Sequence, residues 1–403
     1  MPELVALDLP GGAGFVDALR AVWDTGDAAA PLDPRLPAPA RDALLRALRP
    51  TKVVGSDGEF HTVRDGTPVE EGDALVLATS GSSGGSKGVV LTHDALRASS
   101  LATSTRLAID PDRHAWLACL PLAHVGGLSV VFRALITDTP VTVLPEFDRE
   151  VVEALGRTGR ATHVSLVTTA LQRIDPSVFT CILLGGARPP RQCPPNAVAT
   201  YGLTETASGI VYDGVPLDGV EVAVGDGDGD GGDDGSSGGG NGAGESGGGT
   251  VGAAGEILVR APMLFRCYRD GRSARVRGPD GRADWFATGD IGHVDDDGLL
   301  RVSGRREDVI VTGGEKVWPD AVERALAAHP HIEDVAVWKR SDPEWGERVV
   351  AWIVPNGDPP PTLEEVRDLV GSTLSPWAAP KEIVITTSLP RTLLGKVRRR
   401  DLT

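Results

Sequence analysis

The sequence predicts an α/β protein: a large N-terminal domain of layered α/β subdomains with a small β-rich subdomain, followed by a small α+β domain. Three observations predict this fold. Short apolar runs alternate with amphipathic stretches through the first 220 residues, as in layered α/β folds. After a Gly/Asp-rich stretch the pattern becomes β-type alternation, and from about residue 307 helical and strand patterns return. A length of 403 residues also indicates two or three domains.

In the N-terminal part, apolar runs predict strands at 74–78, 115–120, 141–144, 163–167 and 181–184, and amphipathic stretches predict helices at 94–107, 128–135 and 149–158. Residues 115–132 carry no formal charge and reach the lower length limit of a membrane helix. Pro121, Gly126 and Gly127 lie in the middle of this run. They favour a buried strand followed by a loop and a helix.

The C-terminal part reads as a domain of its own. Helices are predicted at 318–328, where Pro319 takes an early helical position, and at 363–374. Strands are predicted at 335–339, 349–354 and 382–386. We therefore place domains at 1–303 and 308–403, with the boundary at 304–307.

Charge and cysteine content narrow the function classes. With 40 basic and 56 acidic residues the net charge is −16, which is not typical of a nucleic-acid-binding protein. The four cysteines form no CxxC pair, so neither a disulfide framework nor a zinc site is indicated. The N-terminus lacks the basic start and long apolar run of a signal peptide. We expect a cytoplasmic protein without an integral membrane segment.

Residues 225–250 form a Gly/Asp-rich stretch with six acidic and no basic residues. Asp226, Asp228 and Asp230 match the opening of a calcium loop, but Ser237 stands at the twelfth position, where a bidentate Glu is needed. Without large apolar residues the stretch cannot offset its ordering entropy. The sequence therefore predicts a flexible surface insertion.

A second Gly-rich segment, TSGSSGGSKG at 79–88, lies between the apolar runs ALVLA and VVL. Its glycines let backbone amides converge, its hydroxyl groups add donors, and Lys87 adds a positive charge, as a phosphate-binding loop requires. It is not a Walker A loop, because Ser86 and Gly88 stand where Gly and Ser or Thr would be needed. The alternative interpretation is a Gly/Ser linker.

Two shorter motifs follow the phosphate-type loop. YGLTE at 201–205 supplies an aromatic ring, a glycine, a hydroxyl group and a carboxylate that could bind a base, a phosphate and Mg²⁺. TGD at 288–290 places a carboxylate, expected at a turn, that could accept hydrogen bonds from both hydroxyls of a ribose. Taken alone, each motif fits a capping or turn residue better.

Taken in order, five motifs resemble the adenylate-forming acyl- and aryl-CoA ligase superfamily. They are TSGSSGGSKG, YGLTE, ATGD, GRREDVIVTGGEKVWPDAVE and PRTLLGKVRR, and the resemblance runs from about residue 70 to the C-terminus. Within the superfamily, the segment PLAHVGGL and the early position of the phosphate loop most resemble the o-succinylbenzoate–CoA ligases of menaquinone biosynthesis. The early loop implies that part of the usual N-terminal domain is missing.

The resemblance implies a two-step reaction with ATP, Mg²⁺ and coenzyme A. A carboxylate attacks the α-phosphorus of ATP to give an acyl-adenylate, and the thiol of CoA then displaces AMP. Lys87 would hold the β- and γ-phosphates, Thr204 the α-phosphate and Glu205 the Mg²⁺. Lys396 would bridge the acyl carboxylate and the α-phosphate.

The other implied roles concern ligand contacts and domain motion. The residues that would bind ATP or AMP are Thr79, Ser80, Gly81, Ser82, Ser83, Gly84, Lys87, Gly185, Gly186, Ala187, Tyr201, Gly202, Thr204, Asp290 and Arg305. The acid would lie against His124, Gly126, Gly127, Ser165, Val167, Thr168 and Gly186. The small domain would be mobile and rotate about Glu307, which would bring Gly313, Gly314, Glu315 and Lys316 toward CoA.

Two alternatives stay open at this point. The first keeps the chemistry and changes the acid: a fatty-acyl or other aryl-acid CoA ligase, or an acyl-AMP ligase. The second is a catalytically silent acyl-nucleotide binding protein, against which Lys87, Glu205, Asp290 and Lys396 argue. The expected partners are small molecules and not nucleic acid, and the resemblance admits a homodimer.

Deletion of residues 226–249 should leave ATP–pyrophosphate exchange nearly unchanged, because the predicted insertion contributes no apolar core and none of the motif residues. Exchange rate and thermal unfolding of the deletion variant measure this. A collapse of folding or of turnover would show that the segment has a structural role.

Overall fold

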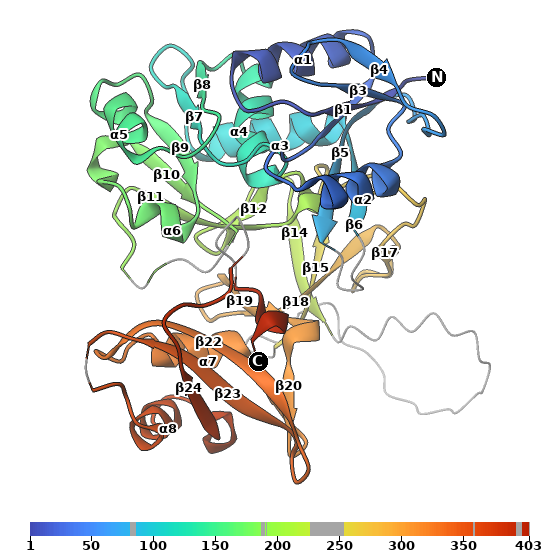
Figure 1. Cartoon of the computed structure of the whole chain (residues 1–403). Coiled ribbons are helices and arrows are strands. Elements are labelled where there is room, and N and C mark those ends of the chain that lie inside the picture. Colours follow the sequence, from blue (N-terminus) through green and yellow to red (C-terminus); the bar gives the residue numbers. More distant parts are fainter. Residues whose placement is uncertain are drawn as a thin grey trace, which may run out of the picture. The chain divides into compact units, whose positions relative to one another are not determined.

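The chain folds into two compact units, shown in Figure 1. The computed structural model describes residues 1–80, 86–186, 190, 192–225, 254–357, 359–391 and 397–402. The first unit contains Met1–Val222, Val259–Val276 and Ala283–Phe286. The second contains Ala223–Leu258, Arg277–Arg282 and Ala287–Thr403.

A seven-stranded sheet in the first unit has the strand order β16-β6-β5-β2-β1-β3-β4. β1 pairs in parallel with β2 and β3, whereas β6 is antiparallel to both β5 and β16. Its buried residues, among them Leu4, Val76 and Val90, pack against Leu44 and Leu48 of helix α2. The strands are β1 (Leu4–Leu7), β2 (Ala28–Pro31), β3 (Lys52–Val54), β4 (Phe60–Thr62), β5 (Asp73–Ser80), β6 (Ser86–Thr92) and β16 (Cys267–Tyr268).

A buried ion pair holds β16 in this sheet. Arg266 donates from Nε and Nη2 to the two carboxylate oxygens of Asp73 at 2.9 and 2.8 Å, although the residues are 193 positions apart in the sequence. Asp73 is fully buried, so the bidentate geometry supplies the hydrogen bonds that water cannot. On the other side of β16, Arg269 donates to the carbonyl groups of Leu48 and Pro68 at 3.0 Å.

The second sheet of this unit has the order β13-β12-β11-β10-β9-β7-β8. The strands from β11 to β8 run parallel, and β12 turns back antiparallel to β11. Its core is apolar, with Leu117, Val164, Ile182 and Leu184 at its centre. The strands are β7 (Trp116–Ala118), β8 (Val141–Val143), β9 (His163–Leu166), β10 (Cys181–Leu184), β11 (Ala197–Gly202), β12 (Gly209–Tyr212) and β13 (Val215–Pro216).

Local capping explains where several helices begin. The side chain of Thr92 accepts a hydrogen bond from the backbone N–H of Ala95 at the start of α3, and Asp148 does the same for Val151 at the start of α5. The helices of the first unit are α1 (Ala13–Asp24), α2 (Ala38–Leu48), α3 (His93–Arg106), α4 (Val125–Ile136), α5 (Arg149–Arg157) and α6 (Thr168–Leu171). Short 3₁₀ turns follow at η1 (Pro176–Val178) and η2 (Thr204–Thr206).

The third sheet contains β14, β15, β18 and β17 in that order, with β19 paired to β18. The division between the two units falls inside β14, β15 and β18 along the chain. This is the small β-rich part that the sequence predicts. Its strands are β14 (Glu221–Gly225), β15 (Gly255–Arg260), β17 (Arg275–Val276), β18 (Trp285–Val294) and β19 (Leu300–Arg305).

The fourth sheet and two helices make up the rest of the second unit. β22 and β23 form a long antiparallel hairpin, and β24 pairs in parallel with β23. One apolar cluster includes Val322, Val349 and Val366, and another includes Trp352 and Leu402. The elements are η3 (Arg306–Asp308), β20 (Ile310–Thr312), β21 (Glu315–Val317), α7 (Pro319–Leu326), β22 (Ile332–Asp342), β23 (Gly346–Pro355), α8 (Leu363–Gly371), η4 (Pro376–Ala378), β24 (Glu382–Ile385) and η5 (Arg399–Asp401).

The segment at 397–402 is anchored by Arg399. Its Nη1 lies 3.1 Å from Asp308, and its Nη2 lies 2.9 Å from Glu323 and also pairs with Asp320. Burial raises the pKa of Glu323 and of Asp308, although the nearby guanidinium opposes the shift. Arg399 is therefore packed into the unit, whereas its neighbours Arg398 and Arg400 are exposed.

The predicted strands and helices of both parts are confirmed, with ends that move by a few residues. Helix α4 begins at Val125, three residues before the predicted start. β22 and β23 are much longer than predicted, because their pairing continues through polar residues such as Arg340 and Arg348. Hydrophobic periodicity predicts the buried centre of a hairpin but not its solvated ends.

Residues 115–132 form β7, a loop and most of α4, as the sequence predicts. Within the described residues, no helix is long and apolar enough to cross a membrane. The boundary predicted at 304–307 lies inside the second unit and stays a prediction. Residues 226–250 of the predicted insertion, including the calcium-like aspartates, lie outside the described residues.

All four cysteines are free thiols. Burial raises the pKa of Cys119 to about 12 and that of Cys181 to about 11. Cys267 is half-buried, whereas Cys193 is exposed on the connection between β10 and β11.

Candidate active site

The phosphate-type loop closes a β-hairpin. β5 and β6 pair antiparallel, which places Thr79 opposite Lys87 at the end of the hairpin. The Thr79 hydroxyl donates to the carbonyl oxygen of Lys87 at 3.4 Å. Gly81, Ser82, Ser83 and Gly84 lie outside the described residues, and only the backbone of Ser80 is described, as the last residue of β5.

Lys87 and Glu205 both contact Tyr268, a residue that the sequence analysis did not select. The Nζ atom of Lys87 lies 5.5 Å from the centroid of the Tyr268 ring. The Tyr268 hydroxyl donates to Oε1 of Glu205 at 3.0 Å. None of the five sequence motifs contains Tyr268. Its position beside Lys87 and Glu205 depends on the pairing of β16 with β6.

The YGLTE segment turns sharply from β11 into η2. A Cβ atom on Gly202 would lie 2.1 Å from the carbonyl oxygen of Ser208, so no larger residue fits there without a shift. The backbone N–H of Leu203 donates to the Thr206 hydroxyl at 2.8 Å. The N–H of Phe265 donates to the carbonyl oxygen of Glu205 at 2.8 Å. Thr204 and Glu205 are both half-buried at this turn, as a ligand-binding pair should be.

The predicted adenine-binding residues follow β10 and lie on the neighbouring β11. Gly186 has a φ of +77°, a left-handed conformation that favours glycine. A Cβ on Gly185 would lie 3.1 Å from the hydroxyl of Thr200, next to Tyr201 in β11. Gly185, Gly186 and Tyr201 therefore belong to adjacent strand ends, whereas Ala187 lies outside the described residues.

A single carboxylate suits the predicted Mg²⁺. Among the described residues no cluster of three or more His, Cys, Asp or Glu could hold a metal ion. Mg²⁺ commonly takes one or two carboxylates and completes its shell with phosphate and water oxygens. Glu205 beside Lys87 and the phosphate-type hairpin fits that mode of binding.

In the second unit, Asp290 and Arg305 form an ion pair. The two residues are register partners in β18 and β19, and Nε of Arg305 lies 2.8 Å from Oδ1 of Asp290. The expectation that Asp290 lies at a turn is wrong. Residues 288–290 lie inside β18, where Gly289 has a φ of +72° and donates its N–H to Glu256. Gly289 is therefore a strand glycine and not part of a turn, and the irregularity in the pairing of β18 with β19 lies between Ile291 and Gly292.

The predicted acid-binding residues lie at the start of α4, on β9 and α6, and directly after β10. His124 precedes the first residue of α4, and a Cβ on Gly127 would lie 2.6 Å from the carbonyl oxygens of Leu120 and Pro121. A Cβ on Gly186 would lie 3.6 Å from the Val167 side chain. The remaining members, Gly126, Ser165 and Thr168, lie on α4, β9 and α6.

The predicted hinge and CoA-side loop lie in the second unit. Glu307 is exposed in η3, and Gly313 and Gly314 form the turn between β20 and β21 with φ of +59° and +86°. Glu315 and Lys316 are exposed in β21. Beside the turn, Nζ of Lys381 lies 3.5 Å from the ring centroid of Trp345, which is 42% exposed. Lys396 lies outside the described residues.

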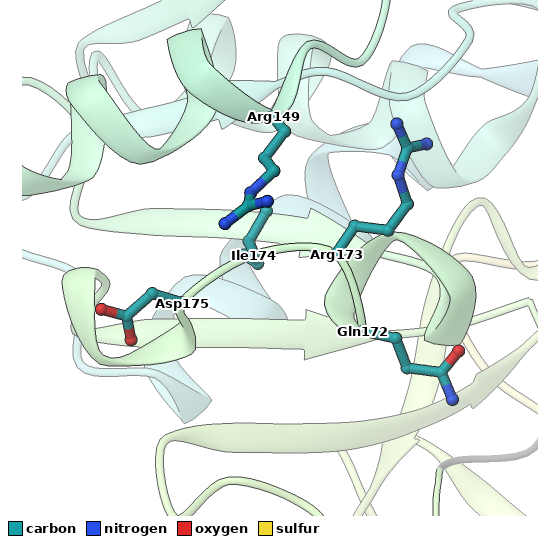
Figure 2. A pocket seen from close by; sticks show the side chains of 5 residues that line it. All are labelled: Arg149, Gln172, Arg173, Ile174 and Asp175. Atoms are coloured by element: carbon teal, nitrogen blue, oxygen red, sulfur yellow. The ribbon is translucent and has the colours of Figure 1, made fainter.

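An open surface pocket of about 540 Å³ contains none of the predicted site residues. Figure 2 shows its lining side chains, Arg149, Gln172, Arg173, Ile174 and Asp175. Arg149 is paired with Glu153 at 3.2 Å, and Glu153 also accepts the backbone N–H of Asp175 at 3.0 Å. The guanidinium of Arg173 lies 4.9 Å from the centroid of the Phe147 ring. Because none of the predicted site residues lies in this pocket, we assign the site to the hairpin and YGLTE segments.

Comparisons with known proteins place the chain in a family. The AMP-binding enzyme model matches residues 61–269, and the AMP-binding enzyme C-terminal domain matches residues 321–396. A probable 2-succinylbenzoate–CoA ligase of Mycobacterium tuberculosis is 37% identical over 365 residues, which cover 84% of this chain and 86% of the relative. The chain belongs to the 2-succinylbenzoate–CoA ligase family of AMP-binding enzymes.

Other members of the family agree in sequence and in fold. A 2-succinylbenzoate–CoA ligase of Bacillus cytotoxicus is 33% identical, covering 81% of this chain and 69% of the relative. The o-succinylbenzoate–CoA synthetase of Bacillus subtilis in complex with its acyl-adenylate intermediate matches with a TM-score of 0.80 and 26% identity, covering 100% of this chain and 88% of that one. These matches confirm the predicted superfamily and its two-domain fold.

This member of the family contains a buried arginine that the sequence analysis missed. Arg133 on α4 is fully buried, and its Nη2 donates to the Ser208 hydroxyl at 3.2 Å. Its guanidinium lies 4.9 Å from the Trp116 ring, while Nε and Nη1 have no hydrogen-bond partner among the described residues. A buried cation is normally paired with a carboxylate. Arg133 is therefore a candidate anion-binding residue.

His163 lies in the same buried cluster. Its ring is 4.7 Å from the ring of His114 and 5.2 Å from that of Trp116, measured between centroids. Burial, reinforced by His114 and Arg133, lowers the pKa of His163 to about 4. The imidazole is therefore neutral at neutral pH and adds no second charge beside Arg133.

The lowered pKa of His163 predicts a pH-dependent stability. As the pH falls, the unfolded chain takes up this proton first, near its ordinary pKa of about 6.5, so the folded state loses stability. We expect the free energy of unfolding to fall by about 2 kcal/mol between pH 7 and pH 5 through this residue. Denaturant unfolding of the wild type and of His163→Gln at both pH values measures the difference.

The matched control is His61→Gln, which removes an exposed imidazole paired with Asp57. The control should keep the pH dependence of the wild type. Equal pH dependence in wild type and His163→Gln would contradict the prediction.

Proposed function

We propose that this protein joins 2-succinylbenzoate to coenzyme A in two steps, with ATP as the energy source. The observation that carries the proposal is the convergence of Lys87, Tyr268 and Glu205 next to the phosphate-type hairpin, in a chain of this family. A cation and a half-buried carboxylate that contact the same tyrosine suit a magnesium–triphosphate. Neither a linker nor a solvated loop would gather them.

In the first step, an oxygen of the acid attacks the α-phosphorus of ATP, and the bond to pyrophosphate breaks. The difficulty is electrostatic, because an anionic nucleophile approaches a polyanion. Lys87 and the hairpin donors would stabilise the negative charge of the β- and γ-phosphates. Thr204 would donate a hydrogen bond to the α-phosphate. Glu205 would hold Mg²⁺, which would neutralise negative charge on the leaving pyrophosphate.

The second unit would contribute ribose binding and the lysine of adenylation. Asp290 accepts from the ribose hydroxyls in this proposal, and Arg305, 2.8 Å away, orients its carboxylate. Lys396 would bridge the acyl carboxylate and the α-phosphate. These roles follow from the family resemblance and stay predictions.

In the second step, the thiol of CoA attacks the acyl carbon, and AMP leaves. The Gly313–Gly314 turn with Glu315 and Lys316 would then face the thiol-bearing arm, after rotation about Glu307. Trp345 and Lys381 lie beside that turn and offer an exposed ring and a cation to the nucleotide part of CoA. We also propose that the protein is cytoplasmic. A measurement of its molecular mass in solution would decide whether two copies of the chain associate.

The choice of acid rests on Arg133. The substrate has two carboxylates, of which one is activated and the other needs a partner. Arg133 lies two helical turns from Gly126 on the same face of α4, within the element that begins the predicted acid pocket. Its two unpartnered donors suit the second carboxylate, and a fatty acid or benzoate would leave them unsatisfied.

Acid-dependent ATP–pyrophosphate exchange tests the function. We expect 2-succinylbenzoate to exceed octanoate and benzoate in kcat/KM by ~100-fold or more, because a buried charge left unpaired penalises the wrong acid. Glu205→Gln should abolish exchange with every acid. Faster exchange with octanoate or benzoate would overturn the assignment of the acid.

Replacement of Arg133 tests the specificity argument. Arg133→Met should raise KM for 2-succinylbenzoate by roughly 30- to 100-fold, through the loss of one buried charge-assisted contact. The variant should fold, because it removes a buried cation that has no carboxylate partner among the described residues. Thermal unfolding checks this.

The control is an analogue from which the carboxylate that is not activated has been removed. Arg133→Met should leave KM for this mono-acid unchanged. An equal increase in KM for both acids would show that Arg133 supports the fold of the pocket and does not bind the second carboxylate.

A further inference from the structure

Tyr268 touches both halves of the proposed phosphate and metal site, and no motif of the sequence assigns it a role. Its hydroxyl binds Glu205 at 3.0 Å, and its ring lies 5.5 Å from the ammonium group of Lys87. We propose that Tyr268 is a positioning residue that holds the metal-binding carboxylate and the phosphate-binding lysine in one fixed arrangement. This inference rests on the proposed function, because it takes Glu205 as the ligand of Mg²⁺.

The hydrogen bond from Tyr268 gives the two carboxylate oxygens of Glu205 different roles. Oε1 accepts from the Tyr268 hydroxyl, while Oε2 has no hydrogen-bond or ion-pair partner within the part of the chain that the structure describes. A carboxylate tied at one oxygen loses most of its rotational freedom. Oε2 is then the oxygen that a single-carboxylate Mg²⁺ site requires.

The contact with Lys87 is equally suited to a ligand. An aromatic face attracts an ammonium group without accepting its N–H donors as a carboxylate would. The three N–H donors of the Lys87 ammonium group therefore stay available to phosphate oxygens. A carboxylate in place of the ring would neutralise the charge that the phosphates need.

Tyr268 is itself held on three sides. In the sheet it is the register partner of Val89, and the next residue, Arg269, donates its N–H to the carbonyl oxygen of Gly88 at 2.7 Å. The Phe265 ring packs against the Tyr268 ring at 4.9 Å between centroids. On the N-terminal side, Arg266 is bound to buried Asp73. The ring is therefore fixed to β6, the strand that carries Lys87.

As a consequence, Glu205 and Lys87 are both fixed relative to residues 265–268, although they come from different sheets. Lys87 belongs to β6 and Glu205 to the turn after β11. A second link supports this, because the N–H of Phe265 donates to the carbonyl oxygen of Glu205 at 2.8 Å. Residues 265–268 thus bind the metal-ligand turn through both its backbone and its side chain.

Two substitutions separate the hydroxyl from the ring. Tyr268→Phe keeps the aromatic face beside Lys87 and removes the hydrogen bond to Glu205. Tyr268→Leu removes both. The probes are Mn²⁺ and the non-hydrolysable analogue β,γ-methylene ATP, with metal affinity read from the electron paramagnetic resonance of free Mn²⁺ and analogue affinity read by calorimetry without metal.

We expect Tyr268→Phe to weaken Mn²⁺ binding to the enzyme–analogue complex about tenfold and to leave metal-free analogue binding within about twofold of the wild type. Tyr268→Leu should weaken both. In Tyr268→Phe/Glu205→Gln the loss should equal that of Glu205→Gln alone, because the Tyr268 hydroxyl acts on the metal only through the Glu205 carboxylate.

The matched control is Tyr212→Phe, which removes another tyrosine hydroxyl, hydrogen-bonded to Thr103 at 3.1 Å. This variant should bind Mn²⁺ like the wild type. Thermal unfolding of each variant separates a positioning effect from loss of the fold.

The outcomes distinguish this inference from the proposed function. If the wild type binds the metal–analogue complex and Glu205→Gln does not, but Tyr268→Phe matches the wild type, the positioning role of Tyr268 is wrong and the function stands. If Glu205→Gln binds Mn²⁺ as well as the wild type does, the metal assignment on which both rest is wrong.

Discussion

The pairing of β16 with β6 is the constraint on which the proposed site depends. It joins residues 267–268 to a strand that ends the phosphate-type hairpin, and the Arg266–Asp73 ion pair holds it in place. Without this pairing, neither Tyr268 nor the turn that carries Glu205 would be fixed relative to Lys87. This long-range contact fixes the segments of Lys87, Glu205 and Tyr268 in one arrangement that suits a polyanionic ligand.

The arginines of this chain differ in whether carboxylates neutralise them, and this difference separates structural arginines from a candidate ligand-binding one. Arg266 and Arg399 are each surrounded by carboxylates and stabilise the packing of distant segments. Arg133 is more deeply buried than either but has a hydroxyl and an aromatic ring as neighbours. A cation whose surroundings do not neutralise it is available to a ligand, whereas a neutralised one is not.

Much of the fold and half of the site could be predicted from the sequence, and the limits have physical causes. Strands and helices with strong periodicity were predictable because their buried faces repeat, and Lys87 and Glu205 were predictable because they lie in short motifs. Tyr268 was not, because strand pairing across nearly two hundred residues leaves no local pattern. Arg133 left one signal, since it is the first charge after the uncharged run 115–132.

The unequal burial of the four thiols has a practical consequence for spectroscopy. Burial raises the pKa of all four thiols, but Cys193 is the exposed one, so it would react first with a maleimide dye. Cys193 lies in the same connection between β10 and β11 as Gly185 and Gly186 of the predicted adenine slot. The native chain therefore offers its own attachment point for a fluorophore that would report nucleotide binding in real time.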